Sequence, residues 1–204
     1  MSPIGRGEDW GATAAVPDGA IWVDDDAAAA EIVADARRRG VAAPPLVLTG
    51  GDLARTLGGT GDRSRLERGE GTRVAVDIGA VLVDGRLRWF VAHLVARRGW
   101  WRGRVLAVCN AAFIGAWNVA PRAHPGDGRL DIVDADLPVR DRLAARRRLR
   151  SGTHVPHPGI SSRRAAAVQF DLDADLDIHL DHVPVGRAGA LSVRVEPAAV
   201  DVWV

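Results

Sequence analysis

The chain has 204 residues, of which 47% are hydrophobic and 26% are charged, a composition that predicts a folded globular protein rather than a disordered one. Its 27 basic and 26 acidic residues leave a net charge of +1 at pH 7, so the total charge gives no electrostatic basis for binding nucleic acid or a membrane. Every basic residue is arginine, which excludes Schiff-base chemistry and the lysine of a Walker-type phosphate loop.

The chain contains one cysteine, Cys109, within the apolar run VLAVCNAAFIG. A single cysteine excludes an intrachain disulfide and argues against a cysteine-based metal site, so we interpret it as a small core residue. No stretch reaches the roughly 18 uninterrupted apolar residues of a transmembrane helix. The N-terminal MSPIGRGEDWG lacks the apolar segment of a secretory signal. We therefore expect a cytoplasmic protein without a transmembrane segment.

The first part of the chain has the pattern of one βαβ unit. A short apolar run, AIWV at 20–23, is followed by three aspartates that supply the N-cap and first-turn acids of a helix at 27–39. Gly40 follows this helix as a C′ residue. A second strand at 44–48 begins with two prolines and leads into a helical turn at 52–59.

From residue 72 onward the pattern changes to short apolar strands. Residues 73–83 and 86–95 are joined by Asp84-Gly85, a dipeptide typical of a two-residue hairpin turn. A helix is predicted at 138–149, where proline begins a run with apolar residues four positions apart. Further strands are predicted at 104–115, 129–137, 165–172, 176–181, 191–196 and 200–204.

The order of these elements predicts an α+β fold in two domains. Residues 1–62 are expected to form a small βαβ head, a reduced α/β segment. Residues 63–204 are expected to form a β-sandwich-like body with one inserted helix.

Several motifs occur in the order in which a known family carries them. The stretch APRAHPGDGRLDIVDAD at 120–136 resembles the AP-x-A…DG-x-LD segment of the bacterial diacylglycerol kinases and related lipid kinases. The other similar motifs are DLARTLG (52–58), VDIG (76–79), Asn110, GTH (152–154) and LDHVPVGRAGALSVRVEP (180–197). The resemblance runs from about Pro45 to the C-terminus and implies a fold like that of NAD kinase and diacylglycerol kinase.

The resemblance implies a kinase in which a Rossmann-like head holds ATP and a β-sandwich body helps to form the lipid site. Phosphoryl transfer needs a backbone cradle for phosphate, a carboxylate for magnesium and a base beside the hydroxyl. By resemblance, Asp181 matches the aspartate of the family's D-G-E motif and would be the catalytic base on the lipid hydroxyl. Asp127 lies where the family binds a structural Mg²⁺. Gly50, Gly51 and Asp52 would belong to the nucleotide site, at the start of a helix.

Three departures from the family pattern affect the nucleotide site. The sequence contains no G-G-D-G-T loop, and residues 1–49 leave room for little more than one βαβ unit. The two glycines precede Asp52 directly, without the threonine and asparagine of the family's G-T-x-N-D segment. The D-G-E motif reads DHV at 181–183 and has lost its glutamate. We therefore interpret the chain as a shortened member that lacks most of the nucleotide-binding domain, which argues against ATP binding.

Each candidate site residue also has a purely structural interpretation. The glycines at 50–51 would make a tight turn, with Asp52 capping the helix that follows. Asp127-Gly128 would make an ordinary turn into the next strand. Asp181 would be a charged residue at the end of an edge strand.

Two arginine-rich segments are candidate contacts for lipid. RRGWWRGR at 97–104 interleaves arginines with Trp100 and Trp101, which would either meet a membrane interface or pack in the core. RDRLAARRRLR at 140–150 has a basic helix face that would either approach anionic headgroups or stay solvated. Through either segment the protein would be peripheral to the membrane.

The histidines do not follow a metal-site spacing. Pro156 argues against a helix that would place His154 beside His157, so we interpret these two as loop histidines. His179 and His182 have no cysteine or glutamate at metal-like spacing nearby.

Two functions remain open from the sequence. The first is an ATP-dependent phosphotransferase that acts on a lipid hydroxyl, its head completed by a partner chain or a homodimer. The second is a non-catalytic relative that keeps the β-sandwich and binds a lipid or a protein. The nucleotide site discriminates between them, and nothing in the sequence predicts a nucleic-acid partner.

Overall fold

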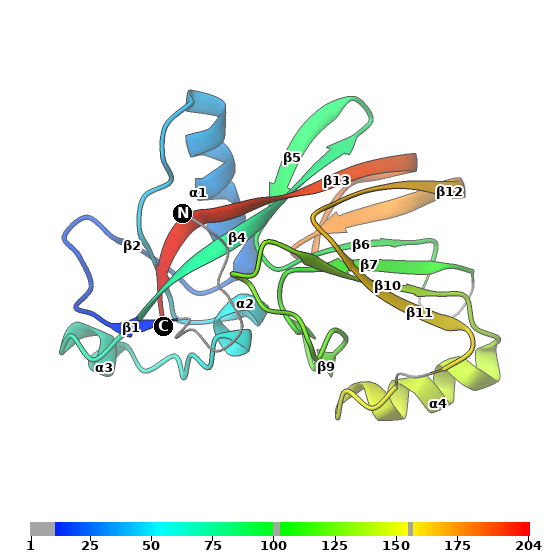
Figure 1. Cartoon of the computed structure of the whole chain (residues 1–204), viewed down its shortest axis with the longest axis horizontal. Coiled ribbons are helices and arrows are strands. Elements are labelled where there is room, and N and C mark those ends of the chain that lie inside the picture. Colours follow the sequence, from blue (N-terminus) through cyan, green and yellow to red (C-terminus); the bar gives the residue numbers. More distant parts are fainter. Residues whose placement is uncertain (1–10, 100–102, 155–156) are drawn as a thin grey trace.

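The computed structural model describes residues 11–99, 103–154 and 157–204. Strands dominate the described chain, and the helices lie around them (Figure 1). The strands are β1 (Ala12–Thr13), β2 (Ile21–Val23), β3 (Leu46–Leu48), β4 (Thr72–Val83), β5 (Arg86–Phe90), β6 (His93–Arg97), β7 (Val105–Cys109), β8 (Phe113–Ile114), β9 (Trp117–Asn118), β10 (Leu130–Ala135), β11 (Ile160–Ala165), β12 (Ala167–Leu180) and β13 (Val183–Trp203). The helices are α1 (Asp26–Arg39), α2 (Gly51–Thr56), α3 (Arg63–Glu67) and α4 (Val139–Leu149).

The predicted βαβ unit is present at the start of the described chain. β2 and β3 are parallel, with Ile21 opposite Leu46, and α1 connects them. The Asp25 carboxylate caps α1 by accepting a hydrogen bond from the Ala28 amide (2.7 Å). Gly40 ends the helix in the left-handed conformation, with a φ of 68°. Because these signals are local, the sequence was enough to predict the helix.

The head and the body share one sheet. Its strand order is β1-β4-β13-β12-β6-β7-β10-β11, with β5 attached to β4 and with β3, which carries β2, attached to β13. β3 pairs in parallel with the end of β13, where Leu46 lies opposite Val202. Buried side chains of α1, α2, β3, β4 and β13 also pack in a common cluster. The division into residues 1–62 and 63–204 stays a prediction, because strand pairing and this cluster join the two parts.

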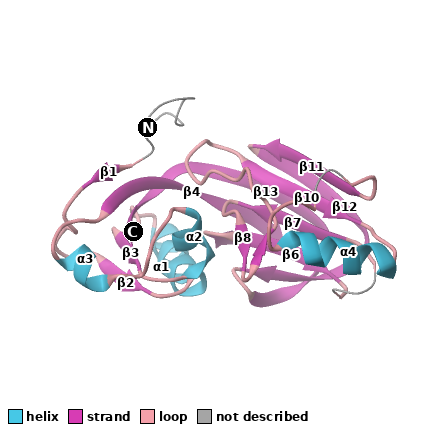
Figure 2. Cartoon of the chain, turned by 90° about the horizontal axis from the view of Figure 1, so that it is seen from below, coloured by secondary structure: helices cyan, strands magenta, loops and turns pink. Residues whose placement is uncertain are grey.

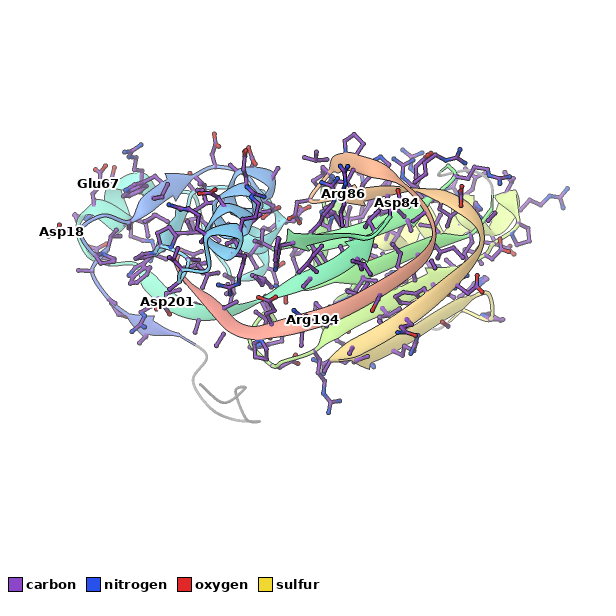
Figure 3. The ribbon with its side chains drawn as sticks, turned by 90° about the horizontal axis from the view of Figure 1, so that it is seen from above. Asp18, Glu67, Asp84, Arg86, Arg194 and Asp201 are labelled. Atoms are coloured by element: carbon purple, nitrogen blue, oxygen red, sulfur yellow. The ribbon has the colours of Figure 1, made fainter. Side chains whose placement is uncertain are left out.

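The sheet of the body folds over a hydrophobic core. In Figure 1, β12 and β13 lie on one side and β6, β7 and β10 on the other. Figure 3 shows that β13 runs from the body, where it carries Arg194, to the head, where it carries Asp201. The side chains buried between the strands include Phe90, Leu94, Ile132, Ile178 and Leu191. The predicted combination of a small α/β head with a β-sandwich is confirmed.

The strongest hairpin signal in the sequence is correct at its turn and wrong at its second strand. Asp84 and Gly85 join β4 to β5 with φ values of 48° and 73°, as in a type I′ turn. The predicted strand 86–95 is instead two strands, β5 and β6, with a break at 91–92. The Asp181 side chain causes the break, because it binds backbone amides there that would otherwise pair with a neighbouring strand.

Other strands are more continuous than the sequence suggested. The predicted strands 165–172 and 176–181 fall largely within β12, whose pairing with β13 is irregular between Asp171 and Leu176. The last two predicted strands are both part of β13, which has an irregularity between Glu196 and Val200. The residues that we interpreted as the ends of strands therefore lie at irregularities within continuous strands.

The inserted helix α4 lies along the outer side of the body, next to β6 and β7 (Figure 2). Ala145 and Leu149 of α4 pack against a cluster that contains Val95, Ala107 and Val133 from three strands. The predicted start is confirmed, since Pro138 is the N-cap residue. Within residues 11–99, 103–154 and 157–204, no helix is long and apolar enough to cross a membrane.

Candidate functional site

The candidate site begins where α1 and α2 start. Because β2 and β3 are parallel neighbours, the segments that follow them lie side by side. The carboxylate of Asp26 accepts hydrogen bonds from the backbone N–H groups of Asp52 (2.5 Å) and Leu53 (3.1 Å). Asp26 is buried, and burial raises the pKa of its carboxyl group. The start of α2 therefore has a buried hydrogen-bond acceptor from within the chain, the Asp26 carboxyl group.

The two glycines before Asp52 are required by this close packing. A Cβ at Gly50 would overlap the carbonyl group of Asp24, and Gly51 has a φ of 93°, in the left-handed region. The interpretation in which Asp52 caps α2 is wrong, because Gly50 is the N-cap residue and Asp26 supplies the acceptor. The Asp52 carboxylate instead accepts a hydrogen bond from the Gly115 amide (2.9 Å) and contacts two histidines.

Asp181 lies in the turn between β12 and β13, and its side chain binds the backbone between β5 and β6. Its carboxylate accepts hydrogen bonds from the amides of Val91 (2.8 Å), Ala92 (2.9 Å) and His93 (2.9 Å). The residue is 2% exposed, and burial raises the pKa of its carboxyl group to about 6. Asp181 thus organises the backbone, and its pKa near neutrality is also the property that a general base needs.

Asp52, His93 and His182 form a compact cluster. Asp52 Oδ2 lies 3.1 Å from His93 Nε2 and 2.9 Å from His182 Nε2, and the two Nε2 atoms are 3.2 Å apart. Burial opposes the ionisation of Asp52, but hydrogen bonds from His93, Gly115 and His182 hold its pKa below the usual value. Burial also opposes the charged form of His93, yet the hydrogen bond to Asp52 and the charge of Asp181 raise its pKa. The buried pair therefore favours a negative Asp52 beside a positive His93.

An open pocket of about 280 Å³ adjoins this cluster. Its lining comes from the starts of α1 and α2 and from the β12–β13 turn, and consists of Asp25, Asp26, Ala27, Gly51, Asp52, Asp181, His182 and Val183. Half of these residues are aspartates. A lining rich in carboxylates repels the phosphates of a nucleotide unless cations intervene.

Asp127 belongs to a different cluster. Its carboxylate pairs with Arg164, and the same guanidinium group reaches Asp131 (3.3 Å). The loop is also tied to β4, because Asp77 accepts a hydrogen bond from the Gly128 amide (2.7 Å). An arginine thus lies between the two carboxylates, and a structural Mg²⁺ at Asp127 stays a prediction.

A second cavity, of about 130 Å³, lies between α4 and the outer face of the body. Its polar lining groups are Arg142, Arg146 and His154, and burial lowers the pKa of the His154 imidazole. The remaining lining residues are all apolar: Val95, Val105, Ala107, Ile114, Trp117, Val119, Val133, Ala135, Leu137, Ala145, Leu149 and Ile160.

The structure brings together part of the set of predicted site residues. Gly51, Asp52 and Asp181 line the open pocket, and Gly50 directly precedes them in the chain. Asp127 is not part of that lining. Trp100 and Trp101 lie outside the residues that the structure describes.

Three residues of the site were not predicted from the sequence: Asp26, His93 and His182. Asp26 was interpreted only as a first-turn acid, although its place after a parallel strand indicates a neighbour of the next βα junction. His93 could have been found as a polar residue inside an apolar strand pattern. No spacing in the sequence pairs it with His182, because 89 positions separate them.

A sequence comparison supports the fold assignment. Residues 74–204 match the family described as the YegS C-terminal NAD kinase β-sandwich-like domain. A search of curated proteins gave no match.

Solved structures from Bacillus anthracis str. Sterne share the fold. Two, of a protein named a putative diacylglycerol kinase, have TM-scores of 0.60 and 0.62, each with 12% identity over 78% of this chain and 69% of theirs. A third, named a diacylglycerol kinase, has a TM-score of 0.57 and 14% identity over 78% of this chain and 66% of its own. Since the sequence match covers well over half of the chain, the protein belongs to the family described as the YegS C-terminal NAD kinase β-sandwich-like domain, and it shares the fold of the solved structures named diacylglycerol kinases.

Proposed function

We propose that this protein is a non-catalytic member of the family that binds a lipid without phosphorylating it. The observation that carries the proposal is the apolar cavity beneath α4. It is lined by twelve apolar residues and three polar side chains, Arg142, Arg146 and His154. An apolar wall with a few polar groups is typical of a small-molecule site. The cavity is suited to part of one acyl chain, with a polar or anionic headgroup beside the arginines.

The outer face of α4 supports contact with a membrane. Val139 and Leu143 lie one helical turn apart and are 51% and 50% exposed. The last turn of the same helix carries three arginines, Arg146, Arg147 and Arg148. A helix with exposed apolar residues among arginines is suited to an anionic membrane surface. The helix that covers the cavity would therefore also be the helix that meets the lipid.

The arginine- and tryptophan-rich segment at 97–104 is the other proposed lipid contact. Arg142 of α4 donates a hydrogen bond to the carbonyl oxygen of Gly103, so the chain just after Trp100 and Trp101 is attached to α4. We propose that the two tryptophans contact the same lipid surface, where amphipathic rings are favourable. If Trp100→Ala and Trp101→Ala leave vesicle binding unchanged, this segment is not part of the surface.

The geometry of the head supports binding without phosphoryl transfer. The β2–α1 junction, where a phosphate loop would lie, carries the carboxylates of Asp24, Asp25 and Asp26. The amides at the start of α2 already donate to Asp26. A nucleotide phosphate would have to displace this carboxylate from buried hydrogen bonds and approach several other acidic groups, both of which cost free energy.

The proposal is tested with a matched pair of variants on α4. Ala145 lines the cavity, whereas Ala144 is exposed on the same helix. The probe is a fluorescent fatty acid, which supplies one acyl chain and one anionic head. We expect Ala145→Leu to fill the cavity and weaken binding by about tenfold or more, a loss of about 1.4 kcal/mol, while Ala144→Leu binds like the wild type. Equal binding by both variants, or no binding by the wild type, would contradict the proposal.

A phosphotransferase is the second candidate function, and one observation favours it. Asp181 has a pKa of about 6 and lines the same pocket as Gly51 and Asp52. In that function Asp181 would be the catalytic base on a lipid hydroxyl, and Mg²⁺ at Asp127 would be structural. A second copy of the chain would have to help bind ATP, because the described head offers no free phosphate cradle at α2.

A further inference from the structure

We propose that Asp52, His93 and His182 form a binding site for a transition-metal dication such as Zn²⁺, with an open coordination position that faces the open pocket of about 280 Å³. Among the residues that the structure describes, this is the one group of three histidine, cysteine or acidic side chains whose ligand atoms all lie within 4.8 Å of one another. The inference does not depend on the lipid-binding function.

The three atoms have the spacing that a tetrahedral ion needs. Zn²⁺ binds imidazole nitrogen and carboxylate oxygen at about 2.0–2.2 Å, which places two such ligands about 3.3 Å apart. Here the separations are 2.9, 3.1 and 3.2 Å, so the three atoms form a nearly equilateral triangle. The His93 and His182 rings are almost perpendicular, at 83°, and each places its Nε2 atom within about 3.1 Å of the same carboxylate oxygen, Asp52 Oδ2. An ion above this triangle requires shifts of only a few tenths of an ångström.

Hydrogen bonding alone explains the cluster less well. Asp52 Oδ2 is within hydrogen-bond distance of three nitrogens, those of His93, His182 and the Gly115 amide. One carboxylate oxygen directs two in-plane lone pairs, so three donors at the same oxygen cannot all be well aligned. A cation relieves this conflict, because both imidazoles then direct lone pairs rather than protons toward the centre. Two nitrogens and one oxygen also favour Zn²⁺-like ions over Mg²⁺, which prefers oxygen ligands.

The position of His182 in the chain is a second, independent observation. Asp181 and His182 form the two-residue turn between paired Leu180 and Val183, with φ values of 46° and 69°. Such type I′ turns favour glycine at the second position, and a histidine there has an unfavourable backbone conformation. Residues held in strained conformations often serve a binding site. In this turn the strain places the His182 imidazole, with its side chain 56% exposed, over buried Asp52 and His93.

The site would connect three parts of the fold. Asp52 comes from α2 in the head, His93 from the start of β6, and His182 from the β12–β13 turn. Asp52 and His93 are buried, whereas His182 faces the open pocket. A fourth ligand, water or a small anion, would therefore reach the ion from the pocket. Metal binding would also fasten the head to the body.

The test uses the whole protein after treatment with a chelator and dialysis. We expect calorimetry to show one Zn²⁺ per chain and Co²⁺ to give the intense visible absorption of tetrahedral coordination. His182→Gly removes one ligand and gives the turn the residue that it favours, so loss of binding cannot be attributed to misfolding. We expect this variant to bind Zn²⁺ at least about 100-fold more weakly, and His179→Gln, three positions earlier at the end of β12, to bind like the wild type.

Three results would overturn the proposal. The first is no Zn²⁺ binding by the wild type at micromolar concentrations, and the second is binding by His182→Gly that is as tight as that of the wild type. The third is a loss of binding in His179→Gln that equals the loss in His182→Gly. Asp52→Asn provides an additional check, because it keeps the shape of the side chain and removes the anionic ligand. Unchanged Zn²⁺ affinity and an unchanged Co²⁺ spectrum in this variant would place the ion elsewhere.

Discussion

The Asp26 carboxylate lies 2.5 Å from the amide nitrogen of Asp52 and closes the start of α2 from inside the protein. Replacing Asp26 with alanine leaves the amides of Asp52 and Leu53 without their acceptor. We expect this variant to lose about 1–3 kcal/mol of unfolding free energy, measured by urea denaturation. Asp24→Ala, in the same triplet but exposed, should change stability by about 0.5 kcal/mol or less. Equal effects of the two substitutions would contradict the capping role of Asp26.

The Asp52–His93 pair predicts a stability contribution that depends on pH. The raised pKa of His93 means that its contribution is complete below the unfolded value of about 6.5 and is lost as the pH rises through the folded value. The lowered pKa of Asp52 means that its contribution is present above about 3.8 and is lost as the pH falls through the folded value. The pair therefore stabilises the fold most in mildly acidic solution.

Asp52→Asn tests this pH dependence in the presence of EDTA. The free energy lost relative to the wild type should be larger at about pH 5.5 than at about pH 8.5. Asp181 and Asp131, whose pKa values are raised to about 6, titrate in both proteins, so their effects largely cancel in the difference. A loss that is the same at both pH values, or greater in alkali, would show that the ion pair does not form.

If the exposed apolar residues of α4 contact the membrane, a charged substitution among them should weaken membrane binding. Leu143→Glu places a negative charge where we propose contact with anionic headgroups. Its co-sedimentation with vesicles of phosphatidylcholine and phosphatidylglycerol should fall by about fivefold or more, from loss of apolar burial together with charge repulsion. Leu87→Glu, at a leucine of similar exposure (45%) far from α4 in the chain, is the control. If both variants bind the vesicles alike, α4 is not the membrane contact.

Gly79 in the VDIG motif lies directly opposite Phe90 in the β4–β5 pair. A Cβ at this position would overlap the Phe90 ring, which is fully buried. Gly79→Ala should therefore lower the unfolding free energy by about 1–3 kcal/mol through overpacking, seen as a lower midpoint of urea denaturation. Gly99→Ala, where a Cβ would meet no atom of the described residues within 4 Å, should be close to neutral. No loss in Gly79→Ala would mean that the ring has room to move.

Sequence patterns predicted the elements whose causes are local. α1 begins after its N-cap residue Asp25 and ends at Gly40. The dipeptide Asp84-Gly85 is by itself enough to specify the hairpin turn, because both of its residues readily adopt a positive φ. Pro138 likewise marks the start of α4. Each of these signals acts within a few residues, so no tertiary information was needed.

The features that were missed depend on contacts between distant residues. The predicted strand 86–95 breaks because of the Asp181 carboxylate, about 90 positions further along the chain. The same separation hides the pairing of His93 with His182. Asp26 and Asp52 meet only because two parallel strands place their ends together. Composition and periodicity carry no information about such contacts.

The most direct test of lipid binding without phosphorylation is the transfer of labelled γ-phosphate from Mg-ATP to vesicles that contain diacylglycerol and a mixed lipid extract. Asp181→Asn is assayed beside the wild type, because it would remove the base of a true kinase. We predict no labelled lipid from either protein under conditions in which the wild type binds lipid. Labelled lipid that forms with the wild type and disappears with Asp181→Asn would contradict the account and establish phosphoryl transfer at the open pocket that Asp181 lines.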